Sequence, residues 1–164
     1  MNLERQHYGN GVIIISFVVS FMLAIMPLPA WATLWRPEWT IMVLIYWCIA
    51  VPQRVGVATG WFVGLIHDVL DNSLLGLHAL TVCLIAYLSV RLHRRVRLFP
   101  VWQQAMGVFV LVALDQFLGT LIRAIFLGNP PTGWSFFYPA VTSMLLWPWV
   151  FIVLRDMRRN YQIF

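Results

Sequence analysis

The feature that most limits what this chain can fold into is a cluster of arginines between two long apolar runs. Four of the eleven Lys and Arg residues fall between positions 91 and 97, and the apolar runs 74–90 and 101–127 lie on either side. Short arginine-rich loops between apolar segments resist translocation and stay on the cytoplasmic side of a membrane. We therefore expect residues 91–97 to be a cytoplasmic loop between two membrane spans.

The composition indicates that lipid surrounds much of the chain. Its 164 residues are 61% hydrophobic and 10% charged, whereas soluble domains carry about 25% charged residues. No polar stretch is long enough for a separate soluble domain, so residues 1–164 are expected to form one integral-membrane helical domain. The net charge of +5 is explained by arginines at the ends of apolar runs, and no nucleic-acid partner is expected.

Six apolar segments are separated by polar or proline-containing stretches. A membrane-spanning helix needs about 20 residues. We expect an all-α polytopic membrane protein with six transmembrane helices, and the segment 37–51 is short enough that a re-entrant arm stays open for it. The segments are about 12–32, 37–51, 55–70, 74–90, 105–127 and 134–154.

Six spans would place both termini on the same side as the loop 91–97, the cytoplasm. Arg36 and Arg123 would then lie outside, against nine arginines inside. This bias follows the positive-inside rule. One alternative concerns the first segment, because Ala30-Trp31-Ala32 resembles the cleavage site of a secretory signal.

Glycines recur every fourth residue in the third segment, at Gly56, Gly60 and Gly64. Residues four apart share one helix face, and small residues there allow another helix to approach closely. The pattern predicts tight helix packing. Packing within this chain and contact with another protein's helix are both open.

Few polar groups are placed for chemistry. The sequence around Asp68, with a histidine before it and Asp71 after it, invites a metal or hydrolase interpretation, but a polar helix end explains it as well. Asp115 lies inside the fifth segment and should face other helices or a partner. Arg123 is about 12 Å further along that helix and about 80° away in rotation, so we expect no direct pair. No catalytic set, cofactor site or metal site is predicted.

Several motifs, in this order and spacing, resemble one family. The last of them contains Trp147-Pro148-Trp149, which predicts a kink with interfacial tryptophans, either as membrane anchors or as a shaped binding surface. The chain resembles the rod shape-determining MreD proteins of Gram-negative rods over nearly its whole length. The motifs are Arg36-Pro37-Glu38-Trp39, Tyr46-Trp47, Pro52-Gln53-Arg54-Val55, Gly60 with Gly64, Asp68, Leu75-Gly76, Trp102-Gln103-Gln104-Ala105, Asp115 and Leu146-Trp147-Pro148-Trp149.

The resemblance implies a non-enzymatic protein of the cell inner membrane that belongs to the cell-elongation (Rod) complex. Its direct partner would be the bitopic protein MreC, and through MreC it would connect to RodA, penicillin-binding protein 2 and MreB. It would support lateral peptidoglycan synthesis and regulation of cell shape. The family is also similar in helix arrangement to the S components of energy-coupling-factor transporters, which is an analogy of fold alone.

Two functions follow as hypotheses. In the first, the protein is a membrane scaffold. In the alternative, it is a small-molecule-binding membrane protein of the S-component type, with Asp68, His78 and Asp115 lining a pocket in the membrane. The candidate partner-contact or structural residues are Arg36, Trp39, Gly60, Gly64, Asp68, Asp115, Trp147 and Pro148.

Overall fold

The computed structural model describes residues 2–128 and 133–161, with side chains described from residue 9 onward except that of Phe136. Within these ranges the chain is all-helical, which confirms the predicted fold class. The helices are α1 (Asn2–Ile25), η1 (Thr33–Trp35), α2 (Trp39–Ala50), α3 (Val57–Leu70), α4 (Leu77–Val96), α5 (Val101–Leu127), η2 (Ser135–Phe137) and α6 (Tyr138–Asn160).

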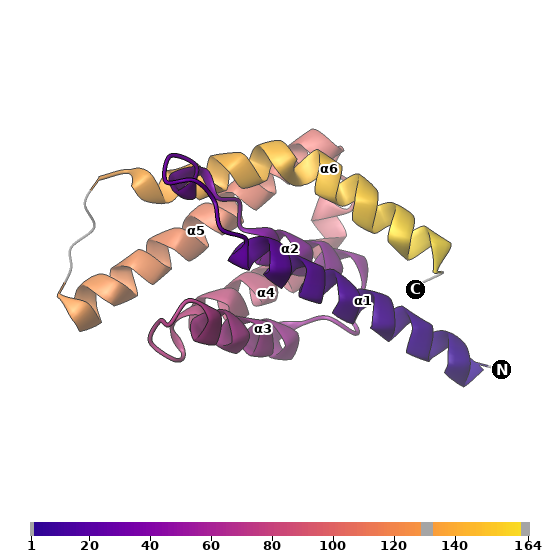
Figure 1. Ribbon diagram of the computed structural model, residues 1–164. Coiled ribbons are helices and arrows are strands. Elements are labelled where there is room, and N and C mark those ends of the chain that lie inside the picture. The colour runs from indigo at the N-terminus through magenta and orange to yellow at the C-terminus, as the bar shows by residue number, and fades with distance from the viewer. Residues whose placement is uncertain (1, 129–132, 162–164) are drawn as a thin grey trace.

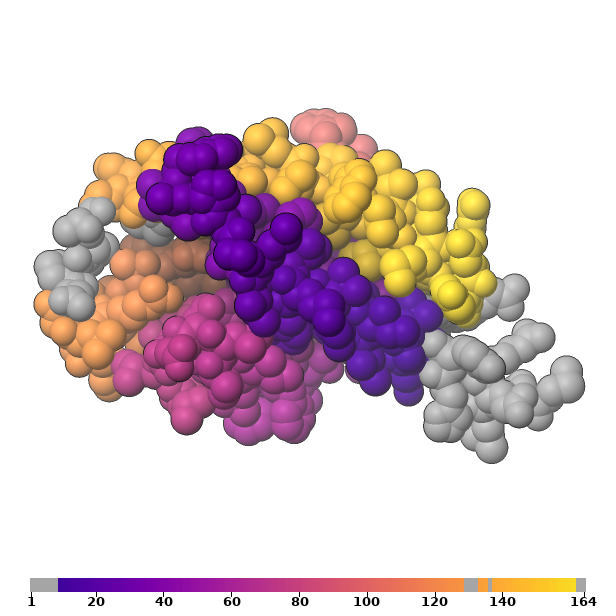
Figure 2. All heavy atoms as spheres, in the orientation of Figure 1, coloured from indigo at the N-terminus to yellow at the C-terminus, as the bar shows by residue number. Residues whose placement is uncertain are grey.

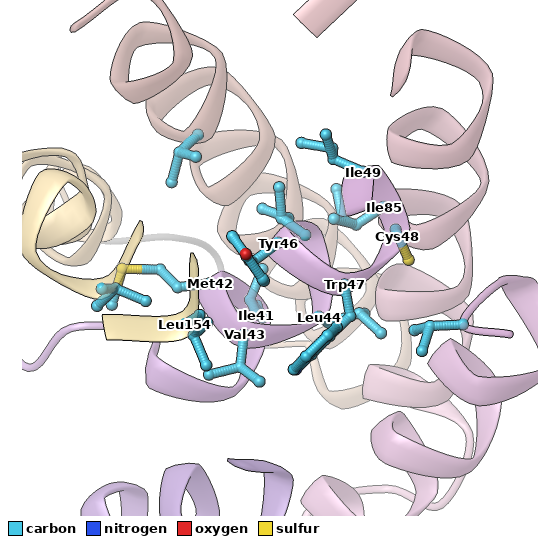
Figure 3. Packing of buried hydrophobic residues seen from close by; sticks show 14 of the residues in the cluster. Ile41, Met42, Val43, Leu44, Tyr46, Trp47, Cys48, Ile49, Ile85 and Leu154 are labelled. Carbon is cyan, nitrogen blue, oxygen red and sulfur yellow. The ribbon is translucent and has the colours of Figure 1, made fainter. Parts of the chain in front are cut away.

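Helix α2 is the centre of the molecule. Every residue from Thr40 to Ile49 is buried, because this helix has no polar face that would need a solvent-exposed side. Figure 3 shows its side chains pointing outward in several directions, with Ile85 of α4 and Leu154 of α6 among the neighbouring residues. Helices α1, α4 and α6 therefore pack against α2, α5 touches it less, and α3 packs on the far side of α4 (Figure 1).

Buried polar contacts fix two of the helices against α2. The Trp47 Nε1–H donates to Ser16 Oγ of α1 at 2.8 Å, and that hydroxyl in turn donates to the Ile13 carbonyl. At the start of α2, the Glu38 backbone N–H donates to Ser143 Oγ of α6 at 3.1 Å. These bonds satisfy polar groups that would otherwise be costly to bury.

The helix bounds differ from the predicted segments at several ends. Helix α1 stops at Ile25 and not near residue 32, because Pro27 and Pro29 cannot continue it. Helix α4 runs on to Val96, so most of the arginine cluster is helical and not a loop. Arginine is a good helix former, and positive charge is favourable at a helix C-terminus.

Helices α5 and α6 also extend beyond their predicted ends. Helix α5 begins at Val101, four residues before the predicted start of the segment 105–127. Helix α6 continues through Pro148 to Asn160, and its axis changes direction along its length (Figure 1). The helix is thus continuous across Pro148, and a kink at that proline stays a prediction.

The basic helix ends converge at one end of the bundle. The Arg97 Nε–H donates to the Ile49 carbonyl at 2.8 Å and its Nη2 to the Ala50 carbonyl, which joins the end of α4 to the end of α2. One cavity here is lined by both Arg97 and Arg158. Arg36 and Arg123 lie near the acidic and histidine groups of the opposite end. Arg97 and Arg158 thus lie at one end and Arg36 and Arg123 at the other, while the full division of nine arginines against two stays a prediction.

Large apolar side chains cover much of the outer surface. Met22 of α1, Ile125 of α5 and Leu145 of α6 are each more than 60% exposed, which water would penalise and lipid would not. By length and apolar composition, α5 and α6 qualify as membrane spans among the described residues, while Gly9–Ile25 and α3 are apolar but shorter. The molecule has the surface of a membrane protein.

Candidate functional site

The most connected polar group in the described chain is the buried carboxylate of Asp68, near the end of α3. It accepts from the backbone N–H groups of Gly76 (2.8 Å), His78 (2.9 Å) and Ala79 (3.2 Å) at the start of α4. The Ser73 hydroxyl donates to it at 2.8 Å. Helix N-termini leave several N–H groups without partners, so Asp68 supplies their acceptor from a neighbouring helix.

His78 connects Asp68 to helix α5. Its Nδ1 lies 2.9 Å from Asp68 Oδ1, and its Nε2 lies 3.4 Å from Nη2 of Arg123. An ionised carboxylate only accepts and a guanidinium only donates, so Nδ1 carries the proton and Nε2 accepts. These contacts therefore connect Asp68 of α3, His78 of α4 and Arg123 of α5 in one series across three helices.

A second set of polar groups lies beside the first. His67 Nδ1 is 3.1 Å from Asp71 Oδ2, and its Nε2 is 4.0 Å from Glu38 Oε2. The other oxygen of Glu38 accepts from Gln116 Nε2 of α5 at 2.6 Å. The His67 imidazole beside Asp71 lowers the pKa of that carboxyl, which lies past the end of α3. We call these residues together with Asp68, His78, Asp115 and Arg123 the polar cluster.

The polar cluster includes three groups that could approach one metal ion. Ligand atoms of His67, Asp71 and His78 all lie within 4.8 Å of one another. Here Asp71 is beside the imidazole of His67, and the Arg123 guanidinium is beside Nε2 of His78. The geometry is that of a network of ion pairs and hydrogen bonds.

Asp115 lies inside the bundle near this cluster. It is 3% exposed, and its Oδ1 has no hydrogen-bond partner among the described residues. Its neighbour Gln116 binds Glu38. Arg123 lies against His78 and not against Asp115, as its rotation around α5 predicts. The carboxylate thus faces the helices of its own chain.

The glycine pattern of α3 lies against α4. A Cβ added at Gly60 would come within 2.7 Å of Ala86 Cβ, and one at Gly64 would come within 2.5 Å of Ala79 Cα. The two backbones are therefore in direct contact along this face. The packing of Gly60 and Gly64 is internal to the described chain, whereas Gly56 precedes α3 as its N-cap and does not lie against α4.

The remaining predicted site residues divide by exposure. Trp147 is fully buried, whereas Pro148 beside it is exposed. Arg36 and Trp39 are half-buried near the polar end. Of the eight predicted residues, Arg36, Trp39 and Pro148 keep surface that a partner could touch, and the other five make contacts within the chain.

Two further surfaces escaped the sequence analysis. A cavity at the basic end is lined by Arg97, Arg155 and Arg158, whose positions in the sequence indicate only the orientation in the membrane. An apolar groove of about 140 Å³ lies between α1 and α6 over α2, lined by Val19, Trp39 and Val153 among others. Figure 2 shows α1 in indigo and α6 in yellow on the same face of the molecule. The apolar character of single segments does not show where two helices leave a groove.

Comparison with known proteins gives a consistent match. Residues 5–157 match the family model described as rod shape-determining protein MreD. The chain is 31% identical over 147 residues, 90% of each chain, to a protein of Haemophilus influenzae named rod shape-determining protein MreD. No solved structure matches.

Proposed function

This chain belongs to the MreD family of rod shape-determining proteins, and from that premise we propose that it is a non-enzymatic scaffold of the cell-elongation (Rod) complex in the cell inner membrane. The family match carries this proposal. It covers nearly all of the chain, so the shape-determining role of the family applies to the whole helical bundle. The scaffold would support lateral peptidoglycan synthesis.

The proposed topology has six membrane-crossing helices with both termini in the cytoplasm. Support comes from the bundle itself, because the arginine-rich ends of α4 and α6 meet at one end and the polar cluster lies at the other. Helix α2 has only 12 residues, or about 18 Å of rise. Neighbouring helices surround α2, so in the proposed topology little of the α2 surface contacts the lipid tails.

The proposed direct partner is MreC, bound through its single membrane-spanning helix in the groove between α1 and α6. The groove is apolar, and Val19, Trp149 and Val153 beside it are 40–59% exposed. A partner helix there would bury these side chains, and tryptophans are frequent anchors of such interfaces. Trp39, a candidate contact from the sequence, lines the same groove. RodA, penicillin-binding protein 2 and MreB would be linked through MreC.

The alternative, a small-molecule carrier similar in helix arrangement to the S components, receives less support. Its proposed pocket needs free polar groups on Asp68, His78 and Asp115, and of these Asp115 Oδ1 is without a hydrogen-bond partner in the described chain. Both oxygens of Asp68 already accept hydrogen bonds from α4, and both ring nitrogens of His78 have neighbours. These side chains hold helices together, as a scaffold requires.

Depletion of the protein tests the role in cell shape. Rods are expected to become spheres, and wild-type protein supplied in trans should restore them. Persistent rods after complete depletion would contradict the role.

Photo-crosslinking in membranes tests the groove. A photoreactive residue in place of Val19 or Val153 should trap the MreC chain, since both lie at the groove. Leu80 of α4 and Val110 of α5 are exposed elsewhere, at 65% and 59%, and serve as controls. Equal trapping of MreC from all four positions would contradict the proposed interface while leaving the shape-determining role intact.

A further inference from the structure

A cavity of about 290 Å³ opens at the basic end of the bundle, between α2, α5 and α6. Three guanidinium groups, from Arg97, Arg155 and Arg158, line it together with aromatic side chains. A second cavity of about 400 Å³ shares Arg97 and Arg158 with the first. Arg97 and Arg158 thus lie between two neighbouring cavities of the same surface. We call the first hollow the arginine cavity.

Arg97 is held in position by the backbone. Its Nε and Nη2 donate to the carbonyls of Ile49 and Ala50, which belong to the last turn of α2 and have no partners within that helix. The planar guanidinium is therefore fixed by two bonds. Its Nη1 makes no hydrogen bond within the described part of the chain and can donate to a ligand. A fixed donor loses little conformational freedom when it binds.

The cavity wall also contains an unused donor. Trp147 lines the cavity and is fully buried, yet its indole Nε1–H has no hydrogen-bond partner in the described chain. A buried donor without an acceptor costs about 1–3 kcal/mol. An acceptor that reached this buried nitrogen would remove that cost.

Positive charge in the cavity is not neutralised from within. The residues that line it include no carboxylate. Asp156 lies 4.0 Å from Arg155, but both side chains are about half exposed, and such pairs contribute little. Three cations around one hollow repel one another unless an anion joins them.

We propose that the arginine cavity binds a phosphate group, carried on the headgroup of a lipid in the leaflet that meets the basic end. The guanidinium fork matches phosphate oxygens, and a phosphate has enough oxygens for several such donors, whereas a carboxylate has two. Basic pockets between membrane helices are a recurrent form of lipid headgroup site.

The surroundings of the cavity fit a headgroup better than a protein segment. Its volume is at the lower limit of small-molecule sites, which run from about 300 to 1,000 Å³. Tyr46, Trp147 and Phe151 line it, and aromatic side chains are enriched at the depth of lipid headgroups. Arg94 and Arg95 lie at the same end but do not line the cavity. These two arginines can orient the protein in the membrane, so orientation alone does not explain why Arg97, Arg155 and Arg158 line the cavity.

Lipid binding to the purified full-length protein tests the proposal. Dioleoyl phosphatidic acid is titrated into the protein in neutral detergent, and bound lipid is counted by native mass spectrometry. Dioleoylglycerol has the same tails without phosphate, and oleate offers a carboxylate. Arg155→Gln with Arg158→Gln removes two charges from the cavity, and Arg94→Gln with Arg95→Gln removes two from the same end outside it.

Phosphatidic acid should bind more tightly than either control lipid. The Arg155/Arg158 pair of substitutions should weaken its binding on the order of tenfold or more, while the Arg94/Arg95 pair leaves it near the wild-type value. Displacement by sodium phosphate, but not by sodium chloride of equal ionic strength, would show that free phosphate enters the same site. Retention of the lipid in both salts would assign the site to the headgroup.

Three results would overturn the proposal. Equal weakening by the two pairs of substitutions would show general surface attraction. Equal binding of oleate or dioleoylglycerol would show that phosphate is not recognised. Tighter binding of an oligoglutamate peptide would identify the cavity as a peptide site. None of these outcomes bears on the role in cell shape, which depletion tests separately.

Discussion

Both carboxylate oxygens of Asp68 are engaged at the start of α4. Oδ1 accepts from the His78 backbone and lies beside its ring, and Oδ2 accepts from Gly76 and Ala79. Gly76 has a φ of +100°, a conformation in which glycine is at ease. A single buried side chain thus fixes the turn between α3 and α4 and the first turn of α4.

Substitution of Asp68 by alanine should destabilise the protein by about 3 kcal/mol or more, because several buried N–H groups lose their acceptor at once. Thermal unfolding in detergent measures the loss. Asp71→Ala is the matched control, since the Asp71 carboxylate is half exposed and such pairs contribute about 0–1 kcal/mol. Equal unfolding midpoints for the two variants would contradict the structural role of Asp68.

For single residues, the sequence predicted where a polar side chain lies along a helix better than it predicted which residues that side chain contacts. Asp68 was expected to lie at a polar helix end, and it does, but its partners on α4 depend on how two helices meet. The separation of Asp115 and Arg123 followed from rotation along one helix, which sequence defines. The contact of Arg123 with His78 joins different helices, and no spacing rule connects residues 45 positions apart.

At the scale of elements, the contact of α3 with α4 is the closest packing in the fold. Gly64 lies against the backbone of His78 and Ala79, with a Cβ position only 2.5–2.7 Å from their atoms. Backbone atoms cannot turn aside as a flexible side chain can. The four-residue glycine spacing predicted such a contact, and the structure identifies α4 as the helix that makes it.

Gly64→Ala should therefore force α3 and α4 apart and destabilise the protein by about 1–3 kcal/mol, the usual effect of overpacking. Gly107→Ala in α5 is the control, because no atom lies within 4 Å of its Cβ position. Alanine there should be neutral or stabilise by up to about 1 kcal/mol through helix propensity. If the unfolding midpoints of both variants shift in the same direction, the close contact of Gly64 with α4 would be contradicted.

Helix limits were the least predictable elements. Apolar runs mark where lipid tails lie and not where a helix stops. Helices α4 and α6 therefore continue into their arginine-rich ends, to Val96 and Asn160. Prolines after Ile25 do stop a helix, and the predicted end near residue 32 was wrong because the length needed for a membrane span does not fix where the helix stops.

At the scale of the whole molecule, charge divides the bundle into two ends. Arginines from α4 and α6 gather around the arginine cavity at one end, and the polar cluster with its carboxylates and histidines occupies the other. The predicted count of nine arginines against two follows from the sequence because it needs only the order of the segments. The two cavities and the groove were not, because each needs side chains from several helices.

This division predicts which parts of the chain are reachable from outside the cell. In intact spheroplasts, a membrane-impermeant maleimide should label Leu34→Cys, since Leu34 is 54% exposed in the segment between α1 and α2. Arg94→Cys lies at the basic end and should react only after the membrane is permeabilised. The wild-type chain supplies the background, because Cys48 is fully buried and Cys83 is partly so. Labelling of Arg94→Cys in intact spheroplasts would show that the basic end of the bundle faces the outside of the cell, opposite to the proposed orientation. The headgroups that meet the arginine cavity would then belong to the outer leaflet, whereas the packing of the helices would be unchanged.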